Sequence, residues 1–350
     1  MNRILEEDLL DIIKQPVNWG KLKNKSVMVT GASGMVGSYF VRTLLKLNEE
    51  QNLNIHVICV VRNTNKIGED IRNSEAAEVI SHDVTQKMEY AGSVDYIIHA
   101  ASPASPLIMK DNPVETIGAN VLGTYYTLEL AKEKNAEGYM FISSREIYGQ
   151  PSENQEFFTE ETYGFVDPLN PRSCYPEGKK AAETMCASFA AEYGLNAKVA
   201  RLAHTYGPGM SIYDGRVQAD FLKNVLFNED IVMKSEGLPV RTYTYIADAV
   251  AGMFFILLNG DAPVYNIGDE NAKISIRGLA ELLVKITPER KLKVKMEIPE
   301  GGTKGCAPFT LGILDSTRLR GLGWKPWHTI EEGFGRTINY LEIEKEEGNI

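Results

Sequence analysis

A short apolar run followed by three evenly spaced glycines most constrains the fold of this 350-residue chain. Residues 26–30 read Ser-Val-Met-Val-Thr, Gly31, Gly34 and Gly37 follow, and a helical pattern over 36–47 begins at once. In a strand–turn–helix unit, the first glycine makes the tight turn, the second admits a pyrophosphate, and the third lets the helix pack on the strand. Unpaired N–H groups at the helix start favour an anion. This spacing predicts a dinucleotide site, with a glycine-rich turn that binds nothing as the alternative.

The first half of the chain alternates strand and helix patterns. The apolar runs are rich in β-branched residues and lack polar alternation, as expected of strands buried on both faces. This alternation predicts an α/β fold with a Rossmann-type doubly wound parallel sheet and crossover helices on both faces. We expect strands at 27–30, 55–61, 78–80, 94–99, 139–142 and 197–202, and helices at 36–47, 114–134 and 177–193.

Regularity weakens in the second half, where glycines, prolines and short elements occupy 207–245. Helical patterns return at 246–258 and 276–286, and we expect the charged tail 342–350 to fray. This part is expected to form a smaller C-terminal substrate-binding lobe of loops and helices. The predicted division is an N-terminal helical extension (1–24), a dinucleotide-binding domain (25–203, with 240–268 returning to it) and the lobe (204–239 and 269–350).

Composition excludes several classes of partner. The net charge of −10 argues against nucleic acid. The apolar run 249–258 is too short to span a bilayer. Acidic residues at 6–8 argue against a signal peptide, and the flanking apolar residues indicate an amphipathic helix that docks on the main domain. The four cysteines lack paired spacing, so we expect no metal site, no disulfide framework and a cytoplasmic protein.

Tyr175 and Lys179 stand four residues apart, so on a helix they share a face. A phenol with a pKa of about 10 is a poor base, but a nearby ammonium and an oxidised nicotinamide both favour phenolate. A predicted strand over 138–143 leads to Ser144 and Glu146, at the strand end where ligands of open α/β sheets bind. We expect Tyr175 as the base, Ser144 polarising the substrate oxygen, and Glu146 as acid, base or sugar anchor. Ordinary loop capping is the alternative for Ser144 and Glu146.

Longer motifs add a resemblance to a known family. They are Ala-Ser-Pro-Ala-Ser-Pro at 101–106, Asn-Pro-Arg-Ser-Cys-Tyr-Pro-Glu-Gly-Lys at 170–179, Ala-Glu-Thr-Met at 182–185, Thr-Tyr-Gly-Pro at 205–208 and Asp-Gly-Arg-Val at 214–217. With these motifs the chain resembles the extended short-chain dehydrogenases/reductases of the nucleotide-sugar epimerase/dehydratase group, from about 25 to 327. Within that group it is most similar to the UDP-glucuronate decarboxylases.

The resemblance implies a common chemical opening. Tyr175 takes a proton from the sugar 4-hydroxyl with help from Ser144, Lys179 holds the nicotinamide ribose and tunes Tyr175, and hydride leaves C4. The 4-keto sugar then loses its C6 carboxylate, dehydrates, epimerises or is released. The implied substrate is a nucleotide sugar, the cofactor is NAD, and the assembly is a homodimer through helices 114–134 and 177–193. Implied cofactor contacts are Gly31, Gly34, Met35, Val36, Gly37, Asp83 (at the adenine), Val84, Ala100, Ala101, Tyr175 and Lys179; implied substrate contacts are Ser102, Pro103, Arg145, His204 and, at the diphosphate, Arg216 and Arg241.

Five positions depart from the family pattern. Arg62 replaces the acidic residue expected after the second strand, and an arginine there can accommodate a 2′-phosphate, which makes NADP a second candidate; stacking on adenine is the other interpretation. Arg145 stands where the decarboxylases have a small residue, His204 replaces an asparagine, and Gly209 replaces an arginine. His204 is interpreted as a catalytic acid or a satisfied histidine. No arginine stands near Leu311, where one that contacts the substrate carboxylate is expected.

The sequence therefore predicts an NAD(P)-dependent enzyme that oxidises a nucleotide sugar at C4. The most specific hypothesis is conversion of UDP-glucuronate to UDP-xylose and CO2. A 4,6-dehydratase, a 4-epimerase or an NADPH-dependent 4-ketoreductase acting on another sugar nucleotide is the enzymatic alternative. A non-catalytic cofactor-sensing scaffold is the alternative of another class, and the presence of Ser144, Tyr175 and Lys179 argues against it.

Overall fold

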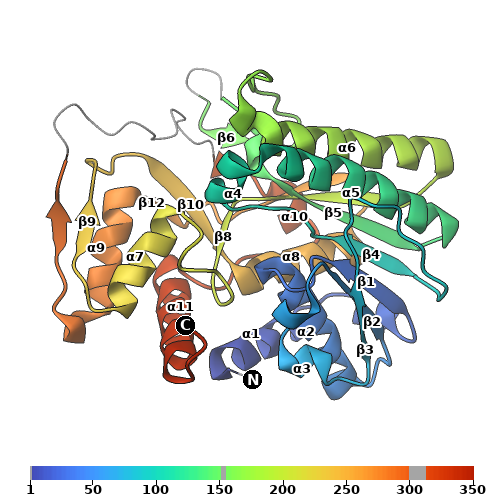
Figure 1. Ribbon diagram of the computed structural model, residues 1–350, viewed down its shortest axis with the longest axis horizontal. Helices are drawn as coiled ribbons and strands as arrows, with labels where there is room; N and C mark the ends of the chain where they lie inside the picture. Colours follow the sequence, from blue (N-terminus) through green and yellow to red (C-terminus); the bar gives the residue numbers. More distant parts are fainter. Residues whose placement is uncertain (1, 151–154, 299–312) are drawn as a thin grey trace.

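A parallel seven-stranded sheet lies at the centre of the computed structural model, which describes residues 2–150, 155–298 and 313–350 (Figure 1). Its strands are β1 (Ser26–Thr30), β2 (His56–Val61), β3 (Ala77–Ser81), β4 (Tyr96–His99), β5 (Gly138–Ser144), β7 (Ala197–Leu202) and β11 (Val264–Ile267). Every pair of neighbours is parallel, in the order β11-β7-β5-β4-β1-β2-β3. This confirms the predicted fold class. The order reverses between β1 and β4, the point where ligands of such sheets bind.

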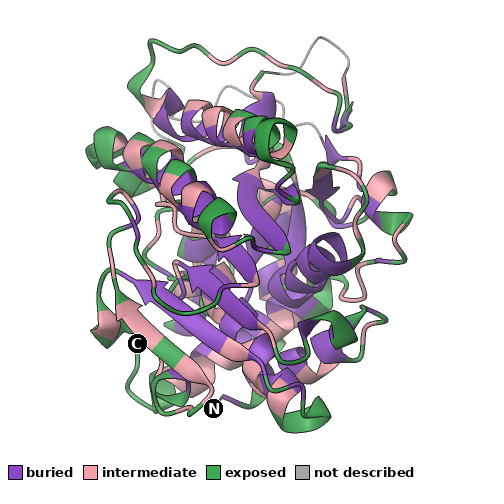
Figure 2. Ribbon diagram, turned by 90° about the vertical axis from the view of Figure 1, so that its right-hand side faces the viewer, coloured by how far each residue is buried: buried purple, intermediate pink, exposed green. Residues whose placement is uncertain are grey.

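Helices cover both faces of this sheet. Alternating side chains of β1 point to opposite cores: Val27 and Val29 pack with α2 (Met35–Gln51) and α8 (Ile246–Asn259), while Met28 packs in the core under α5 and α6. Figure 2 shows the strands buried between helices with exposed outer faces. Helix α8 is buried along nearly its whole length, so its apolar run belongs to the core. The other two covering helices are α5 (Pro113–Glu133) and α6 (Cys174–Tyr193).

Helix α6 begins three residues before the predicted start at 177. A proline inside a helix removes a hydrogen bond and clashes with the preceding turn. In the first turn, however, the missing N–H costs nothing, and Pro176 is accommodated there. Tyr175 and Lys179 therefore both lie on the helix.

The second half of the chain contains short strands as well as helices, so the expectation of loops and helices alone was wrong. A three-stranded sheet contains β8 (His204–Tyr206), β10 (Val240–Tyr245) and β12 (Lys273–Ser275). Residues 240–245 thus pair with this small sheet, whereas 264–267 join the large one. The remaining strands form two-stranded pairs: β9 (Ile231–Met233) with β13 (Val294–Met296), and β6 (Phe157–Phe158) with β14 (Ile313–Leu314).

The C-terminal tail is helical to Glu346, so the predicted fraying from 342 was wrong. Thr329 and Glu332 form a capping box at the helix start, and Arg290 forms an ion pair with Glu342. These contacts hold residues that look like a solvated charge run in the sequence. Further helices are α3 (Glu69–Arg72), α4 (Pro106–Asp111), α7 (Val217–Leu226), α9 (Ile276–Ile286), α10 (Thr317–Arg320) and α11 (Ile330–Glu346). Further 3-10 turns are η1 (Trp19–Leu22), η2 (Thr64–Lys66), η4 (Pro171–Ser173) and η5 (Pro288–Arg290).

The N-terminal helix, α1 (Arg3–Ile13), packs against α2, α8 and α11. Its Asp8 carboxylate is buried and accepts hydrogen bonds from the hydroxyls of Tyr39 (2.8 Å) and Tyr245 (2.7 Å) and from Arg336 Nη2 (2.6 Å). Burial raises the pKa of Asp8 despite the Arg336 charge. This one carboxylate connects helices from both halves of the chain.

Candidate active site

The glycine-rich turn builds a cradle at the end of β1. Gly31 adopts φ +67°, and a Cβ atom there would lie 2.8 Å from Ala101 Cα. A Cβ atom on Gly37 would lie 2.2 Å from the Gly31 carbonyl oxygen, so both positions require glycine. No side chain caps α2 at Gly34, and this uncapped start lines the cavity described below. The first-turn N–H groups therefore suit the pyrophosphate of a dinucleotide.

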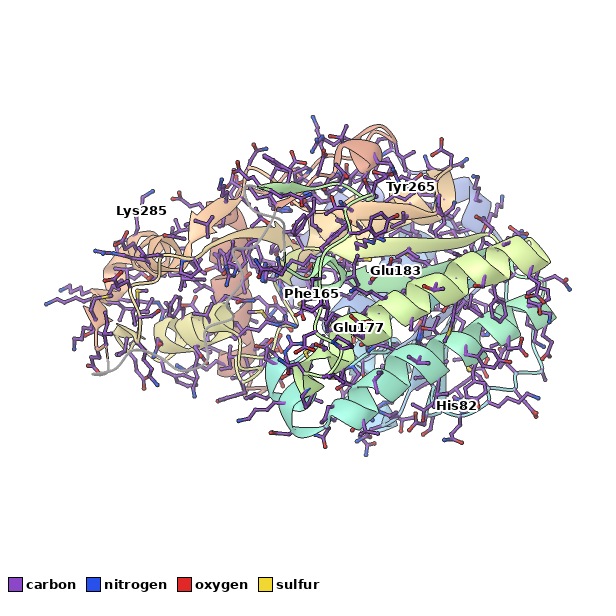
Figure 3. The ribbon with its side chains drawn as sticks, turned by 90° about the horizontal axis from the view of Figure 1, so that it is seen from above. His82, Phe165, Glu177, Glu183, Tyr265 and Lys285 are labelled. Atoms are coloured by element: carbon purple, nitrogen blue, oxygen red, sulfur yellow. The ribbon has the colours of Figure 1, made fainter. Side chains whose placement is uncertain are left out.

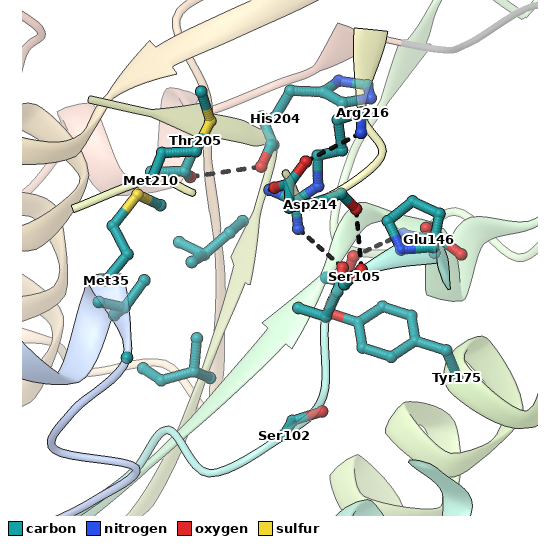
Figure 4. Close-up of a pocket in the computed structure, with 18 of the residues that line it drawn as sticks. Met35, Ser102, Ser105, Glu146, Tyr175, His204, Thr205, Met210, Asp214 and Arg216 are labelled. Carbon is teal, nitrogen blue, oxygen red and sulfur yellow. Dashed lines mark hydrogen bonds and ion pairs between the residues drawn. The ribbon is translucent and has the colours of Figure 1, made fainter. Parts of the chain in front are cut away.

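A cavity of about 630 Å³ opens at the carboxyl ends of the large sheet. Its size suits a nucleotide-sized ligand. Figure 4 shows side chains from the sheet, from α6 and from the small sheet converging on it. Fifteen of the residues named above as site candidates line it: Gly31, Gly34, Met35, Val36, Gly37, Ala100, Ser102, Ser144, Arg145, Glu146, Tyr175, Lys179, His204, Arg216 and Arg241.

Five other site candidates do not line this cavity, and their predicted roles stay predictions. Ala101 lies behind the turn, where its N–H donates to Thr30 Oγ1 at 3.3 Å. Arg62 follows β2 and forms an ion pair with Glu115 of α5. A hydrogen bond from the Thr85 N–H is the main cause that lowers the pKa of Asp83, and the Arg62 charge adds to it. The remaining two are Val84 and Pro103.

Ser144 and Glu146 lie where β5 turns into the 3-10 helix η3 (Arg145–Tyr148). Ser144 Oγ accepts a hydrogen bond from the Glu146 N–H at 3.2 Å, so the capping alternative is realised. Its own hydroxyl proton stays available to a substrate oxygen. Glu146 accepts a hydrogen bond from Arg172 Nη2 at 3.0 Å, which orients its carboxylate at the cavity wall.

Lys179 is buried beneath the cavity, and its Nζ donates to the Ile142 carbonyl oxygen at 2.6 Å. Burial lowers its pKa to about 7, while the Glu183 carboxylate acts in the opposite direction. Its Nζ lies 5.5 Å from the centroid of the Tyr175 ring, one turn earlier on α6. The ammonium is therefore close enough to influence the phenol.

The Tyr175 phenol is protonated in the ligand-free site. Burial, and then the Glu146 charge, raise its pKa to about 12, although Ser144, Arg216 and Arg172 act to lower it. A base with this pKa needs added positive charge nearby to work at neutral pH. An oxidised nicotinamide supplies one such charge, in agreement with the sequence-based expectation.

His204 on β8, Arg216 and Arg241 also line the cavity, and Figure 4 shows Arg216 near His204. We call these three residues the arginine wall. Burial, and then the charges of Arg145, Arg241 and Arg216, lower the pKa of His204 well below its usual value. A neutral imidazole is a poor proton donor, which disfavours the catalytic-acid interpretation. The satisfied-histidine interpretation is incomplete too, because Nδ1 has no partner among the described residues. His204 is therefore a neutral member of the arginine wall.

Sequence reasoning missed several residues in or beside the cavity. Arg172, which orients Glu146, and Asp214, which pairs with Arg216 at 3.5 Å, both lie within the quoted motifs. The motifs were a signal for them, but only the spatial arrangement shows their pairing. Met210 and Gln218 line the cavity without any sequence signal. Leu311, near which the family pattern expects an arginine, lies outside the described part of the chain.

The described residues contain neither a cluster of metal-ligand side chains nor a helix that could cross a membrane. Across 2–150, 155–298 and 313–350, no three His, Cys, Asp or Glu side chains group as metal ligands would. Within the same ranges, every helix is too short or too polar to cross a bilayer.

The chain belongs to the NAD dependent epimerase/dehydratase family, which matches residues 27–268. It is 32% identical over 335 residues to UDP-glucuronic acid decarboxylase 1 of Xenopus tropicalis, which covers 92% of this chain and 73% of that one. It is 32% identical to UDP-glucuronic acid decarboxylase 6 of Arabidopsis thaliana, with 89% and 87% covered. A solved UDP-glucose 4-epimerase of Thermotoga maritima has 26% identity and a TM-score of 0.76, over 91% of this chain and 99% of that one. The predicted family, its NAD dependence and its nucleotide-sugar chemistry are confirmed.

Proposed function

We propose that this enzyme oxidises UDP-glucuronate at C4 and decarboxylates it to UDP-xylose. The observation that carries the proposal is one cavity that brings Ser144, Glu146, Tyr175 and Lys179 together with an arginine-rich wall. The similarity to two UDP-glucuronic acid decarboxylases supports the same substrate.

The chain's residues fit NAD, which accepts a hydride from the sugar and returns it when bound. The uncapped start of α2 would hold the pyrophosphate, where Gly34, Met35 and Val36 line the cavity. Lys179 would hold the nicotinamide ribose, with its ammonium fixed by the Ile142 carbonyl. The charge of Lys179 also favours the phenolate of Tyr175.

Tyr175 would take the proton of the sugar 4-hydroxyl, while the Ser144 hydroxyl donates a hydrogen bond to the same oxygen. The 4-ketone that results lies β to the C6 carboxylate. Breaking the C5–C6 bond releases CO2 and leaves the electron pair on C5 as an enolate. The Tyr175 phenol can return a proton to the enolate oxygen, and a further proton adds at C5. Glu146, which accepts a hydrogen bond from Arg172, lines the same cavity and would lie near the substrate.

Other outcomes of the same opening remain the alternatives. A 4-epimerase or 4,6-dehydratase would use the same Tyr175 and Ser144, and Glu146 suits a dehydratase as well as a decarboxylase. A 4-ketoreductase would exchange its cofactor at every turnover, whereas a decarboxylase retains it. The cavity-lining Tyr175 and Lys179 disfavour a non-catalytic scaffold.

We propose NAD rather than NADP as the cofactor of this chain. Arg62 stands where a 2′-phosphate would need a cation, but its guanidinium is already paired with Glu115. Asp83 adds a second carboxylate near the same arginine. Two carboxylates and one guanidinium disfavour a dianionic phosphate and suit ribose hydroxyls. Chromatography of the nucleotide released from denatured protein tests this: NAD is expected, and NADP would overturn it.

We also propose a homodimer through α5 and α6, which lie side by side along one face (Figure 3). Their outer surfaces carry apolar residues: Val114 is 81% exposed, Leu122 44% and Tyr125 42%. Light scattering of wild type and of Leu122→Asp tests this, with a dimer and a monomer expected; a monomeric wild type would contradict it. The cytoplasmic location stays a prediction for fractionation of the source cells.

The decisive test of the substrate is mass spectrometry of UDP-glucuronate incubated with the purified enzyme. Loss of CO2 from the sugar nucleotide is expected, and Tyr175→Phe should abolish it. Tyr163→Phe is the matched control, because that side chain is 88% exposed. An unchanged UDP-glucuronate, with NAD and NADP supplied separately, would overturn the decarboxylase and favour another sugar nucleotide.

A further inference from the structure

We propose that Arg145 binds an anionic substituent of the sugar, the C6 carboxylate of a uronic acid, and so selects the substrate. The inference rests on the proposed function, since it assumes that a nucleotide sugar occupies the cavity. It assigns to one residue the carboxylate recognition for which the family pattern expects an arginine near Leu311.

The position of Arg145 in the chain places its charge beside the reacting groups. It stands between Ser144 and Glu146, at the point where β5 ends and η3 begins, and it lines the cavity. The Ser144 cap on the Glu146 N–H fixes the backbone on both sides of it. Arg145 therefore enters the cavity from the sheet edge that carries the proton-transfer residues.

The groups that feel the Arg145 charge indicate which way it faces. Glu146 acts on it from the sheet side, and Arg241 of β10 acts on it from the small sheet. Among the arginine charges that lower the pKa of His204 on β8, that of Arg145 has the largest effect. The Arg145 guanidinium therefore lies in the same cavity as Glu146, His204 and Arg241 and close enough to interact with their charges.

Arg145 differs from Arg172 and Arg216 in having no ion-pair partner within 4 Å among the described residues. Arg172 donates to Glu146 at 3.0 Å, and Arg216 lies 3.5 Å from Asp214 and donates to the Ala104 carbonyl oxygen. Across the described residues, no hydrogen bond or ion pair joins the Arg145 guanidinium to another group. Burial, and then the Arg241 charge, lower the pKa of Arg145 to about 10, while the Glu146 charge acts in the opposite direction.

A half-buried guanidinium that lines the cavity without an ion-pair partner is a suitable site for an anionic group of a ligand. A diphosphate already has Arg216 and Arg241 as its predicted partners. The third guanidinium lies nearer the reacting groups, and a planar fork suits a carboxylate. A neutral hexose would leave Arg145 unpaired, so discrimination between uronate and hexose follows.

Calorimetric titration of the holoenzyme with UDP, UDP-glucose and UDP-glucuronate tests the assignment. Wild type is expected to prefer UDP-glucuronate to UDP-glucose by at least about 30-fold, the scale of a buried charge pair. Arg145→Met should remove most of that preference and leave the affinity for UDP nearly unchanged. Arg145→Lys should retain part of it. Arg277→Met, on the exposed face of α9, is the matched control and should behave as wild type.

Two results would overturn the proposal. An equal loss of affinity for UDP and both UDP-sugars in Arg145→Met would assign Arg145 to the diphosphate. A uronate preference that survives in Arg145→Met would place carboxylate recognition elsewhere. Unchanged UDP binding and thermal melting in the variant exclude misfolding as the cause.

A second pair of probes separates this proposal from the proposed function. Glucuronic acid 1-phosphate and glucose 1-phosphate make the same comparison without a nucleotide base. An Arg145-dependent preference for the uronate, combined with no CO2 release from UDP-glucuronate, would support the anion site and overturn the decarboxylase. No uronate preference by wild type in either pair of probes would overturn the anion site.

Discussion

The sheet edge and the arginine wall face each other across one cavity, yet they are built in different ways. At the sheet edge, each reactive group comes from a regular element: the glycine turn from β1 and α2, Ser144 from β5, and Tyr175 with Lys179 from α6. On the wall, His204, Arg216 and Arg241 come from short strands and a helix start of the small sheet region. Long regular elements thus position the groups that would move the proton, whereas short strands and a helix start position the predicted diphosphate contacts.

Replacing the phenol at the sheet edge should have the largest effect. Tyr175→Phe is expected to lower kcat about a thousandfold, because it removes the group that moves the hydroxyl proton. Binding of UDP-glucuronate should change little. Steady-state kinetics and titration measure the two separately. A loss of binding with kcat preserved would move Tyr175 to the substrate-holding side of the comparison.

Disturbing the glycine turn should weaken nucleotide binding while sparing the wall. A Cβ on Gly37 meets the Gly31 carbonyl oxygen at 2.2 Å, so Gly37→Ala must displace the start of α2. A misplacement of about 1 Å in an active site can lower the reaction rate about a hundredfold. We expect Gly37→Ala to be purified with little bound NAD, and Gly335→Ala to retain it, because no atom lies within 4 Å of a Cβ there. Full NAD content in Gly37→Ala would contradict the cradle.

Substituting Asp8, which lies outside the active site, tests whether its hydrogen bonds stabilise the contact between the two halves of the chain. Asp8→Asn weakens the hydrogen bonds to Arg336 and to two tyrosines, and should lower the free energy of unfolding by about 2 kcal/mol. Asp11→Asn, whose carboxylate pairs with Lys14 at the surface, should change it by less than about 0.5 kcal/mol. Urea denaturation of both variants decides; equal effects would contradict the bridging role.

Burial of the Lys179 ammonium should appear as a pH dependence of stability. The pKa of Lys179 is about 7 in the folded protein and 10.5 ordinarily. Between these values the unfolded chain binds more protons, so stability relative to Lys179→Met should rise from pH 7 to pH 10. Below pH 6 the difference should be constant. Denaturation of ligand-stripped protein across this range measures it, and a falling difference would contradict the burial of an uncompensated amine.

How much could be predicted from the sequence follows the same division. The glycine turn and the Tyr175–Lys179 spacing are local patterns, and the sequence predicted where they would lie. The resemblance to the family named His204, Arg216 and Arg241 as substrate contacts, but the strands of the small sheet could not be predicted. Strands of three to six residues carry too little periodicity, and β8 pairs with β10 through residues 39 apart, such as His204 with Tyr243. The pairing of Arg62 with Glu115 also links distant elements, β2 and α5. Sequence predicted the residue types there, and only the fold shows which charges meet.

The capping box at Thr329 shows a signal that was present but not used. Its Thr-x-x-Glu pattern precedes α11, which the sequence analysis did not predict. The charged residues beyond 342 masked it, because a charge run usually indicates a solvated end. Tertiary contacts, such as the hydrogen bond from Lys345 to the Leu226 carbonyl oxygen, extend the helix instead.

In the proposed reaction, Tyr175 starts an oxidation at C4 that ends in loss of the sugar carboxylate. The most direct test is mass spectrometry of UDP-glucuronate labelled with deuterium at C4, after incubation with wild type and with Tyr175→Phe. We expect wild type to release CO2 and to form a UDP-pentose that retains the deuterium, and we expect the variant to do neither. CO2 release that persists in Tyr175→Phe, or a labelled UDP-glucuronate that wild type leaves intact, would contradict it.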